Sequence, residues 1–178
     1  MSGRKSARVA YSALLGAISL IFLYGAAIFP TGVWGLVAIA GLGPCAAVAS
    51  LGISVGFLCW GGVSLLALLL LPDKFCALLF LFLFGLYPML KARAEQARSR
   101  RFAWIVKLVF FNLSFTILVF FLKSLMLASL PEFLNRYGIP VLYLVANIVF
   151  FIYDFGLTKL IIFYLDRIDN AIRKWIRR

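Results

Sequence analysis

The sequence predicts an all-α polytopic membrane protein, a bundle of about six transmembrane helices with both termini in the cytoplasm. Three observations support this prediction. Apolar residues make up 65% of the 178 residues and the mean hydropathy is +1.06, whereas soluble domains are roughly 45–50% apolar. The apolar residues form unbroken runs, each near the roughly 20 residues that a helix needs to cross a bilayer. The lysines and arginines gather at the two chain ends and in one loop.

Proline, glycine and polar residues mark where the apolar runs end. The first run stops at Pro30-Thr31-Gly32, and the third stops at Pro72-Asp73-Lys74. The second run contains Gly41-Leu42-Gly43-Pro44, which predicts a kink or break. The boundary between the second and third runs is marked only by the weak turn signal of residues 50–54. The predicted helices cover residues 9–29, 33–50, 51–71, 75–90, 102–130 and 140–165, in one membrane domain that also has a basic loop, 91–101, and an amphipathic basic tail, 166–178.

The distribution of positive charge predicts the orientation and supports the helix count. With six crossings, the N-terminus, the 91–101 loop and the tail all fall on one side and together carry thirteen lysines and arginines. The other side carries only Lys74 and Arg136. Cytoplasmic loops are the ones enriched in lysine and arginine, so we expect the basic side to face the cytoplasm and the anionic leaflet of the cell membrane. Merging the second and third runs into one crossing would place the basic loop opposite the basic N-terminus.

Composition argues against several functional classes. The net charge of +12 is segregated to the ends and one loop, and no soluble domain is present to carry a nucleic-acid interface. The chain has no histidine, and its three cysteines lie in apolar runs without the spacing of metal ligands. No paired carboxylates occur within an apolar run, and no nucleophile elbow or phosphate-binding loop is found. We therefore expect neither an enzyme nor a cofactor.

Polar residues inside the predicted helices are the main functional candidates, because charge at bilayer depth is costly and faces the bundle interior or water. Asp154 and Asn112 are predicted near mid-bilayer on two different helices, so Asp154 could accept a hydrogen bond from Asn112, or pair with Lys107 or Lys159. One interpretation is packing by interhelical hydrogen bonds. The other is an ion- or proton-coupled site at Asp154. The candidates are Lys107, Asn112, Asn147, Asp154 and Lys159.

Small residues on the first predicted helix form a second candidate site. Ala13 and Ala17 are four residues apart, with Gly16 beside them, and small residues at this spacing let another helix approach closely. The surrounding segment, Arg8-Val9-Ala10-Tyr11-Ser12-Ala13-Leu14-Leu15-Gly16-Ala17, resembles the first helix of the substrate-binding S components of energy-coupling-factor (ECF) vitamin transporters. The resemblance implies a small six-helix bundle in which Ala13 and Ala17 contact the transmembrane T subunit of an energising module that contains an ATPase.

Two further stretches, residues 84–91 and 107–112, look like those of uncharacterised S-component-like membrane proteins of clostridial bacteria, for which no substrate is implied. S components bind their vitamin between outer loops and the outer halves of several helices. The outer connections predicted here are short, which suits a small or apolar ligand or a fold kept for another purpose. The polar and aromatic residues available in this outer region are Thr31, Trp34, Glu132, Asn135, Arg136 and Tyr137.

Three functional hypotheses follow. The first is a small-molecule-binding, vitamin-like capture subunit of an ECF-type transporter. The second is a non-transporting membrane scaffold or assembly protein that acts through the 91–101 loop and the tail. The third is an ion- or proton-coupled carrier that uses Asp154.

Overall fold

The protein is all-helical, and six of its helical segments are long and apolar enough to cross a membrane within the described part of the chain. A computed structural model describes residues 2–29, 32–96, 99–126 and 138–166. The six segments are Ser6–Ile28, Val33–Leu51, Ile53–Leu70, Lys74–Glu95, Arg100–Phe121 and Pro140–Tyr164. The chain is therefore a multi-pass membrane protein, as the apolar runs predict.

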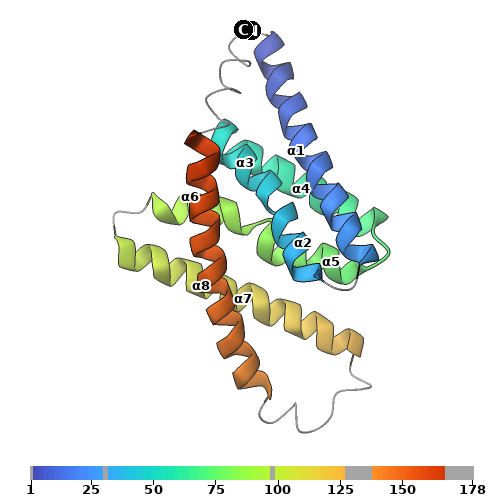
Figure 1. The fold of residues 1–178 in the computed structure, drawn as a ribbon, viewed down its shortest axis with the longest axis vertical. Helices are drawn as coiled ribbons and strands as arrows, with labels where there is room; N and C mark the ends of the chain where they lie inside the picture. The colour runs from blue at the N-terminus through green and yellow to red at the C-terminus, as the bar shows by residue number, and fades with distance from the viewer. Residues whose placement is uncertain (1, 30–31, 97–98, 127–137, 167–178) are drawn as a thin grey trace.

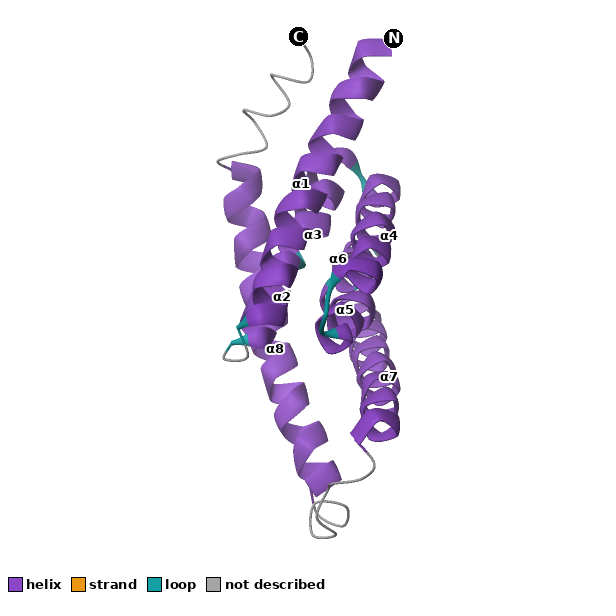
Figure 2. Ribbon diagram, turned by 90° about the vertical axis from the view of Figure 1, so that its right-hand side faces the viewer, coloured by secondary structure: helices purple, strands orange, loops and turns teal. Residues whose placement is uncertain are grey.

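The helices form two layers (Figure 2). One layer contains α1 (Ser2–Ile28), α2 (Val33–Ala40), α3 (Leu42–Leu51) and α8 (Ile139–Tyr164). The other contains α4 (Ile53–Leu70), α5 (Lys74–Leu79), the π-helix η1 (Phe80–Phe84), α6 (Tyr87–Glu95) and α7 (Arg100–Met126). In Figure 1, α8 lies across α6 and α7 rather than parallel to them.

Glycine and proline shape the second span. Gly41 separates α2 from α3, and Pro44 lies in the first turn of α3. Backbone N–H groups in the first turn have no acceptor within the helix, so a proline there costs no helical hydrogen bond. The next boundary is Gly52, whose φ of +96° is a conformation that glycine adopts without steric cost. This glycine lies within the weak turn signal of residues 50–54 and separates the second span from the third.

The fourth span contains a π-helical turn that its sequence did not predict. The N–H of Gly85 donates to the carbonyl of Phe80 at 2.8 Å, which closes a turn one residue wider than an α-helical turn. Pro88 follows and cannot donate to the carbonyl of Phe84. That carbonyl faces Gly41 so closely that a Cβ there would meet its oxygen at 2.6 Å. Gly41 therefore permits close contact between the α2–α3 break and η1.

The structure revises the predicted end of this span. The predicted helix 75–90 continues to Glu95, so Lys91 belongs to α6 and not to the basic loop. Lys91 is almost fully buried, at 1% exposure. The predicted helix 102–130 is described as far as Met126, and the tail beyond residue 166 lies outside the described residues.

The core lies mainly between α1, α2, α3, α4 and the α5–η1 segment, and consists largely of small and aliphatic residues. Ser19 on α1 supports this packing, because its hydroxyl donates to the carbonyl of Ala40 at 2.8 Å and to that of Leu15 at 3.1 Å. Gly43 faces Ser19 so closely that a Cβ there would lie 2.0 Å from the Ser19 hydroxyl oxygen. A second, more aromatic core cluster lies around Cys45, Tyr87, Phe150 and Leu157.

Candidate functional site

A buried cluster of charged residues joins α6, α7 and α8. Asp154 on α8 is 4% exposed and accepts hydrogen bonds from the Tyr87 hydroxyl and the Lys91 ammonium, both on α6. Lys107 on α7 approaches the same carboxylate, with its Nζ 3.3 Å from Oδ1 and 3.4 Å from Oδ2. Tyr87 and Lys91 are four residues apart in one helix, so they share a face that is directed at α8.

Glu95 completes this cluster at one more helical turn. Its Oε1 lies 3.0 Å from the Nζ of Lys91 and 2.8 Å from the Nζ of Lys107. Lys91 also donates to the Thr158 hydroxyl at 2.8 Å. The Glu95 side chain is 48% exposed, whereas the side chains of Lys91 and Asp154 are at most 5% exposed. The cluster therefore begins at the surface and ends at a buried carboxylate.

The charges of the cluster balance. Two lysines face two carboxylates, and a buried charge is tolerated when it is paired and hydrogen-bonded. Because removal of one partner would leave an uncompensated charge among apolar helices, the arrangement fixes α6, α7 and α8 relative to one another. We define Tyr87, Lys91, Glu95, Lys107, Asp154 and Thr158 as the α6–α8 ion cluster.

The structure brings only some of the predicted intramembrane polar residues together. Lys107 pairs with Asp154, as the sequence allowed. The possible hydrogen bond between Asn112 and Asp154 is not formed, because Asn112 instead pairs with Asn147 through reciprocal amide bonds of 3.0 and 3.1 Å. Lys159 is exposed, with its ammonium 5.5 Å from the ring centre of Phe155, so the possible pairing with Asp154 is not formed either.

Sequence reasoning missed Tyr87, Lys91, Glu95 and Thr158. Lys91 and Glu95 were assigned to the basic loop, where charge needs no partner. A signal was nevertheless present: Tyr87, Lys91 and Glu95 recur every four residues, which is the spacing of one helical face.

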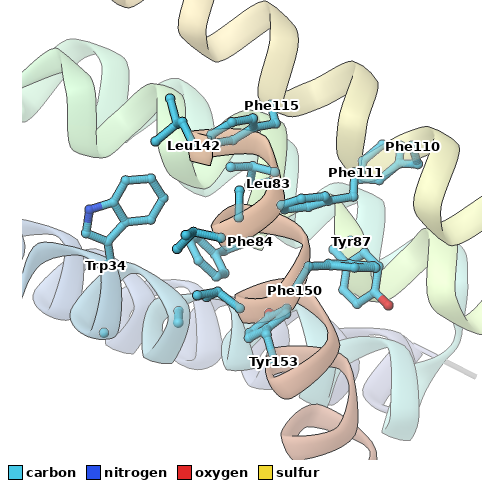
Figure 3. A pocket seen from close by; sticks show the side chains of 15 residues that line it. Trp34, Leu83, Phe84, Tyr87, Phe110, Phe111, Phe115, Leu142, Phe150 and Tyr153 are labelled. Carbon is cyan, nitrogen blue, oxygen red and sulfur yellow. The ribbon is translucent and has the colours of Figure 1, made fainter. Parts of the chain in front are cut away.

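An aromatic cavity of about 490 Å³ lies between α2, η1, α6, α7 and α8 (Figure 3). Tyr87 belongs to both sites, because it lines the cavity and its hydroxyl donates to Asp154. The π-helical turn contributes Leu83 and Phe84 to the wall. The lining is formed by Trp34, Gly35, Ala38, Leu83, Phe84, Tyr87, Phe110, Phe111, Phe115, Leu142, Val145, Ala146, Val149, Phe150 and Tyr153.

The predicted outer ligand region is only partly described. Trp34 lines the cavity from α2, and its ring packs edge-to-face on Phe75 with the ring centres 6.0 Å apart. The other residues of that prediction lie outside the described residues: Thr31, Glu132, Asn135, Arg136 and Tyr137.

The small residues of α1 divide between two environments. Ala13 and Ala17 are exposed, while Gly16 is buried and packs against α4, since a Cβ there would lie 3.2 Å from Val63. All three line a groove of about 410 Å³ between α1 and α4. Internal packing therefore explains Gly16 and does not explain the two alanines.

Within the described residues, no three histidine, cysteine, aspartate or glutamate side chains are grouped so that they could hold a metal ion. Comparisons of the chain with models of protein families, with curated proteins and with solved structures give no match. The chemistry of the cavity, the ion cluster and the α1–α4 groove is therefore the basis for a functional proposal.

Proposed function

We propose that this protein is the small-molecule-binding subunit of a transporter of the ECF type, which captures its ligand in the membrane and relies on a separate T subunit and ATPase for energy. The aromatic cavity is the observation that carries the proposal. Its volume of about 490 Å³ is that of a site for a small organic molecule, and such sites are concave and mostly apolar. Its position within a six-helix membrane bundle suits a capture subunit.

The exposed face of α1 supplies the proposed contact with the T subunit. Ala13 and Ala17 lie on this face, in the groove between α1 and α4. Membrane helices associate where small residues let their backbones approach, so a helix of the T subunit would pack against these two alanines. A tryptophan at either position would prevent the close approach.

The experiment is co-purification from the native membrane in mild detergent, with identification of the recovered chains by mass spectrometry. The protein should recover a T subunit and an ATPase, and the Ala13→Trp and Ala17→Trp variants should lose both. Ile18→Trp is the matched control, because Ile18 lies on the same helix, is 43% exposed, is not part of the groove and is turned about 100° around the helix from Ala17. Ligand uptake should fall in the two alanine variants and persist in the control.

The proposal fails if no T subunit or ATPase is recovered and uptake is unchanged in Ala13→Trp and Ala17→Trp. Loss in all three tryptophan variants would also contradict it, because the effect would then come from a general disturbance of α1 and not from the groove.

A second candidate function is an ion- or proton-coupled carrier that uses Asp154. The half-exposed Glu95 favours it, because this carboxylate connects the buried Lys91 and Lys107 to the surface. Intramembrane carboxylates paired with lysines occur along ion and proton paths. Asp154→Asn should then abolish flux in reconstituted vesicles, and full flux in that variant would eliminate the carrier.

A further inference from the structure

We infer that the aromatic cavity binds an uncharged, flat apolar ring compound that enters sideways from the hydrocarbon core of the bilayer. This inference rests on the proposed small-molecule function and names the class of ligand. Three features of the cavity carry it: the chemistry of its wall, the stacking of its rings and the position of its mouth.

The wall offers no group that could neutralise a charged ligand. The charged side chains nearest the cavity, those of the ion cluster, are already paired with one another. The two tyrosines of the wall carry neutral hydroxyls. The Tyr87 hydroxyl donates to Asp154. The Tyr153 hydroxyl is buried and has no hydrogen-bond partner among the described residues, which leaves one neutral donor but nothing that balances an ionic charge. A carboxylate or ammonium that entered this site would lose its hydration without gaining an oppositely charged partner, which is unfavourable in an apolar environment.

The rings of the wall form a stack that a flat molecule would extend. Phe111 is stacked on Phe150, with ring centres 4.4 Å apart and an angle of 19° between their planes. Phe115 is stacked on the same Phe111, at 5.8 Å and 16°. Aromatic rings in offset-stacked arrangements attract one another beyond the effect of burying their area. Figure 3 shows Trp34 and Phe84 across the cavity from the Phe111 and Phe115 side.

One opening of the cavity lies at membrane depth. Val145 and Val149 line the cavity and are 49% and 54% exposed. Both belong to the segment Pro140–Tyr164, well inside its ends, where an exposed side chain of a membrane-spanning helix meets lipid rather than water. A ligand dissolved in the bilayer would reach the cavity past these two valines without crossing a polar region.

Gly35 provides a way to fill the cavity without disturbing the fold. It lines the cavity, and a Cβ built there meets no heavy atom within 4 Å, so Gly35→Leu projects into open space. Gly61 on α4 is the matched control, because its Cβ also meets nothing within 4 Å and it lies outside the cavity. Both changes replace a helical glycine by a good helix former. Val149→Phe, at the exposed mouth, is a second blocking variant.

The test is equilibrium binding of two radiolabelled probes to the full chain in phosphatidylcholine nanodiscs, with subtraction of the probe taken up by empty nanodiscs. The uncharged probe is 2-methyl-1,4-naphthoquinone, and the charged probe of similar ring size is 2-naphthoate. We expect saturable binding of the quinone only. Its affinity should fall by at least about tenfold, equivalent to about 1.4 kcal/mol, in Gly35→Leu and Val149→Phe. It should be unchanged in Gly61→Leu.

Several results would overturn the inference. These are equal binding of 2-naphthoate, absence of saturable quinone binding, or full binding in Gly35→Leu and Val149→Phe. Native mass spectrometry provides a further check. A phospholipid that stays bound to the unmodified protein, is lost in the Gly35→Leu variant and is not displaced by added quinone would assign the cavity to a lipid acyl chain instead. The outcome is separable from the proposed function. Quinone binding without recovery of a T subunit contradicts the transporter role alone, whereas recovery of the T subunit with preference for the charged probe contradicts this inference alone.

Discussion

Asp154 is the residue on which the arrangement of the last three spans depends most directly. It is buried and faces two ammonium groups, while Glu95 balances the second positive charge. Replacing a buried ion pair by apolar residues is often neutral, whereas removing one partner costs about 3–5 kcal/mol. The ion cluster therefore allows a test in which charge balance, rather than the number of contacts, determines stability.

We predict that Asp154→Asn lowers the free energy of unfolding by about 3 kcal/mol. The introduced asparagine can still accept a hydrogen bond from the Tyr87 hydroxyl, so the loss of stability measures the effect of removing the negative charge. Adding Lys91→Met should recover a large part of this loss, because Lys107 and Glu95 then remain as a balanced pair at 2.8 Å.

The measurement is reversible unfolding in mixed micelles, analysed as a double-mutant cycle. Additive losses in the double variant would contradict the prediction. The control is Lys159→Met, an exposed lysine of the same helix, which should change stability by at most about 0.5 kcal/mol.

The Tyr87 hydroxyl should contribute more to stability than an ordinary tyrosine hydroxyl. It donates to a buried carboxylate, and hydrogen bonds to charged groups contribute about 1.5–3 kcal/mol. Tyr87→Phe should therefore cost that amount. Tyr143→Phe is the comparison, because the Tyr143 hydroxyl pairs with the neutral Thr116 hydroxyl at 2.7 Å. Its loss should cost about 0.5–1.5 kcal/mol. Thermal unfolding of the two variants in the same detergent gives the difference between their losses of stability. Equal losses would show that the carboxylate of Asp154 adds nothing to the strength of the Tyr87 hydrogen bond.

At the residue scale, sequence reasoning identified two of the six residues of the ion cluster, for a physical reason. Asp154 and Lys107 were recognisable because charges within an apolar run need an explanation. Lys91 was not, because the polar residues that follow it look like a loop, and the helix end is set by contacts with α7 and α8 that composition does not encode. The reciprocal pair of Asn112 and Asn147 depends on the same relative placement of α7 and α8.

At the scale of the helices, close approach between α1 and α3 depends on Gly43. A Cβ there would lie 2.0 Å from the Ser19 hydroxyl oxygen and 2.8 Å from the Leu15 carbonyl oxygen. The carbonyl belongs to the backbone of α1 and cannot rotate away, so the helices would have to separate. The same separation would weaken the hydrogen bond from Ser19 to Ala40, which is 2.8 Å long.

We predict that Gly43→Ala lowers the free energy of unfolding by about 1–3 kcal/mol, the usual cost of overpacking. Gly61→Ala should instead raise stability, by up to about 1 kcal/mol, because alanine favours a helix and its Cβ meets nothing within 4 Å. Unfolding of both variants in mixed micelles provides the comparison. If Gly43→Ala is as stable as Gly61→Ala, the close approach of α1 and α3 does not contribute to the fold.

Helix positions followed from the sequence more readily than helix shape. Gly41 with Pro44 predicted the break between α2 and α3, because these residues act locally on the backbone. The π-helical turn at Phe80–Phe84 was not predicted, since its five residues are all apolar and suit an ordinary helix equally well. Its position beside the cavity agrees with the tendency of such turns to occur at functional sites.

At the scale of the whole molecule, six spans place both described ends of the bundle on one side of the membrane. An even number of crossings was predicted from charge as well as hydropathy, and the number of spans agrees. The aromatic cavity could not be predicted in the same way. Its wall combines residues from α2, η1, α6, α7 and α8, which include segments far apart in the sequence. Apolar residues in a membrane helix look the same whether they line a cavity or face lipid.

The orientation of the bundle can be tested with two added cysteines. We predict that Ser99→Cys, in the basic connection between α6 and α7, faces the cytoplasm, and that Pro72→Cys, between α4 and α5, faces outward. Both positions are exposed, and the native Cys45, Cys59 and Cys76 are buried, so the unmodified protein is a low-background control. A membrane-impermeant maleimide should label Pro72→Cys in intact cells and Ser99→Cys only after permeabilisation. The opposite pattern would reverse the orientation. Labelling of both positions in intact cells would contradict the single crossing, Lys74–Glu95, that separates the two connections. If the predicted pattern is found, the Trp34 end of the cavity lies toward the outer side of the membrane.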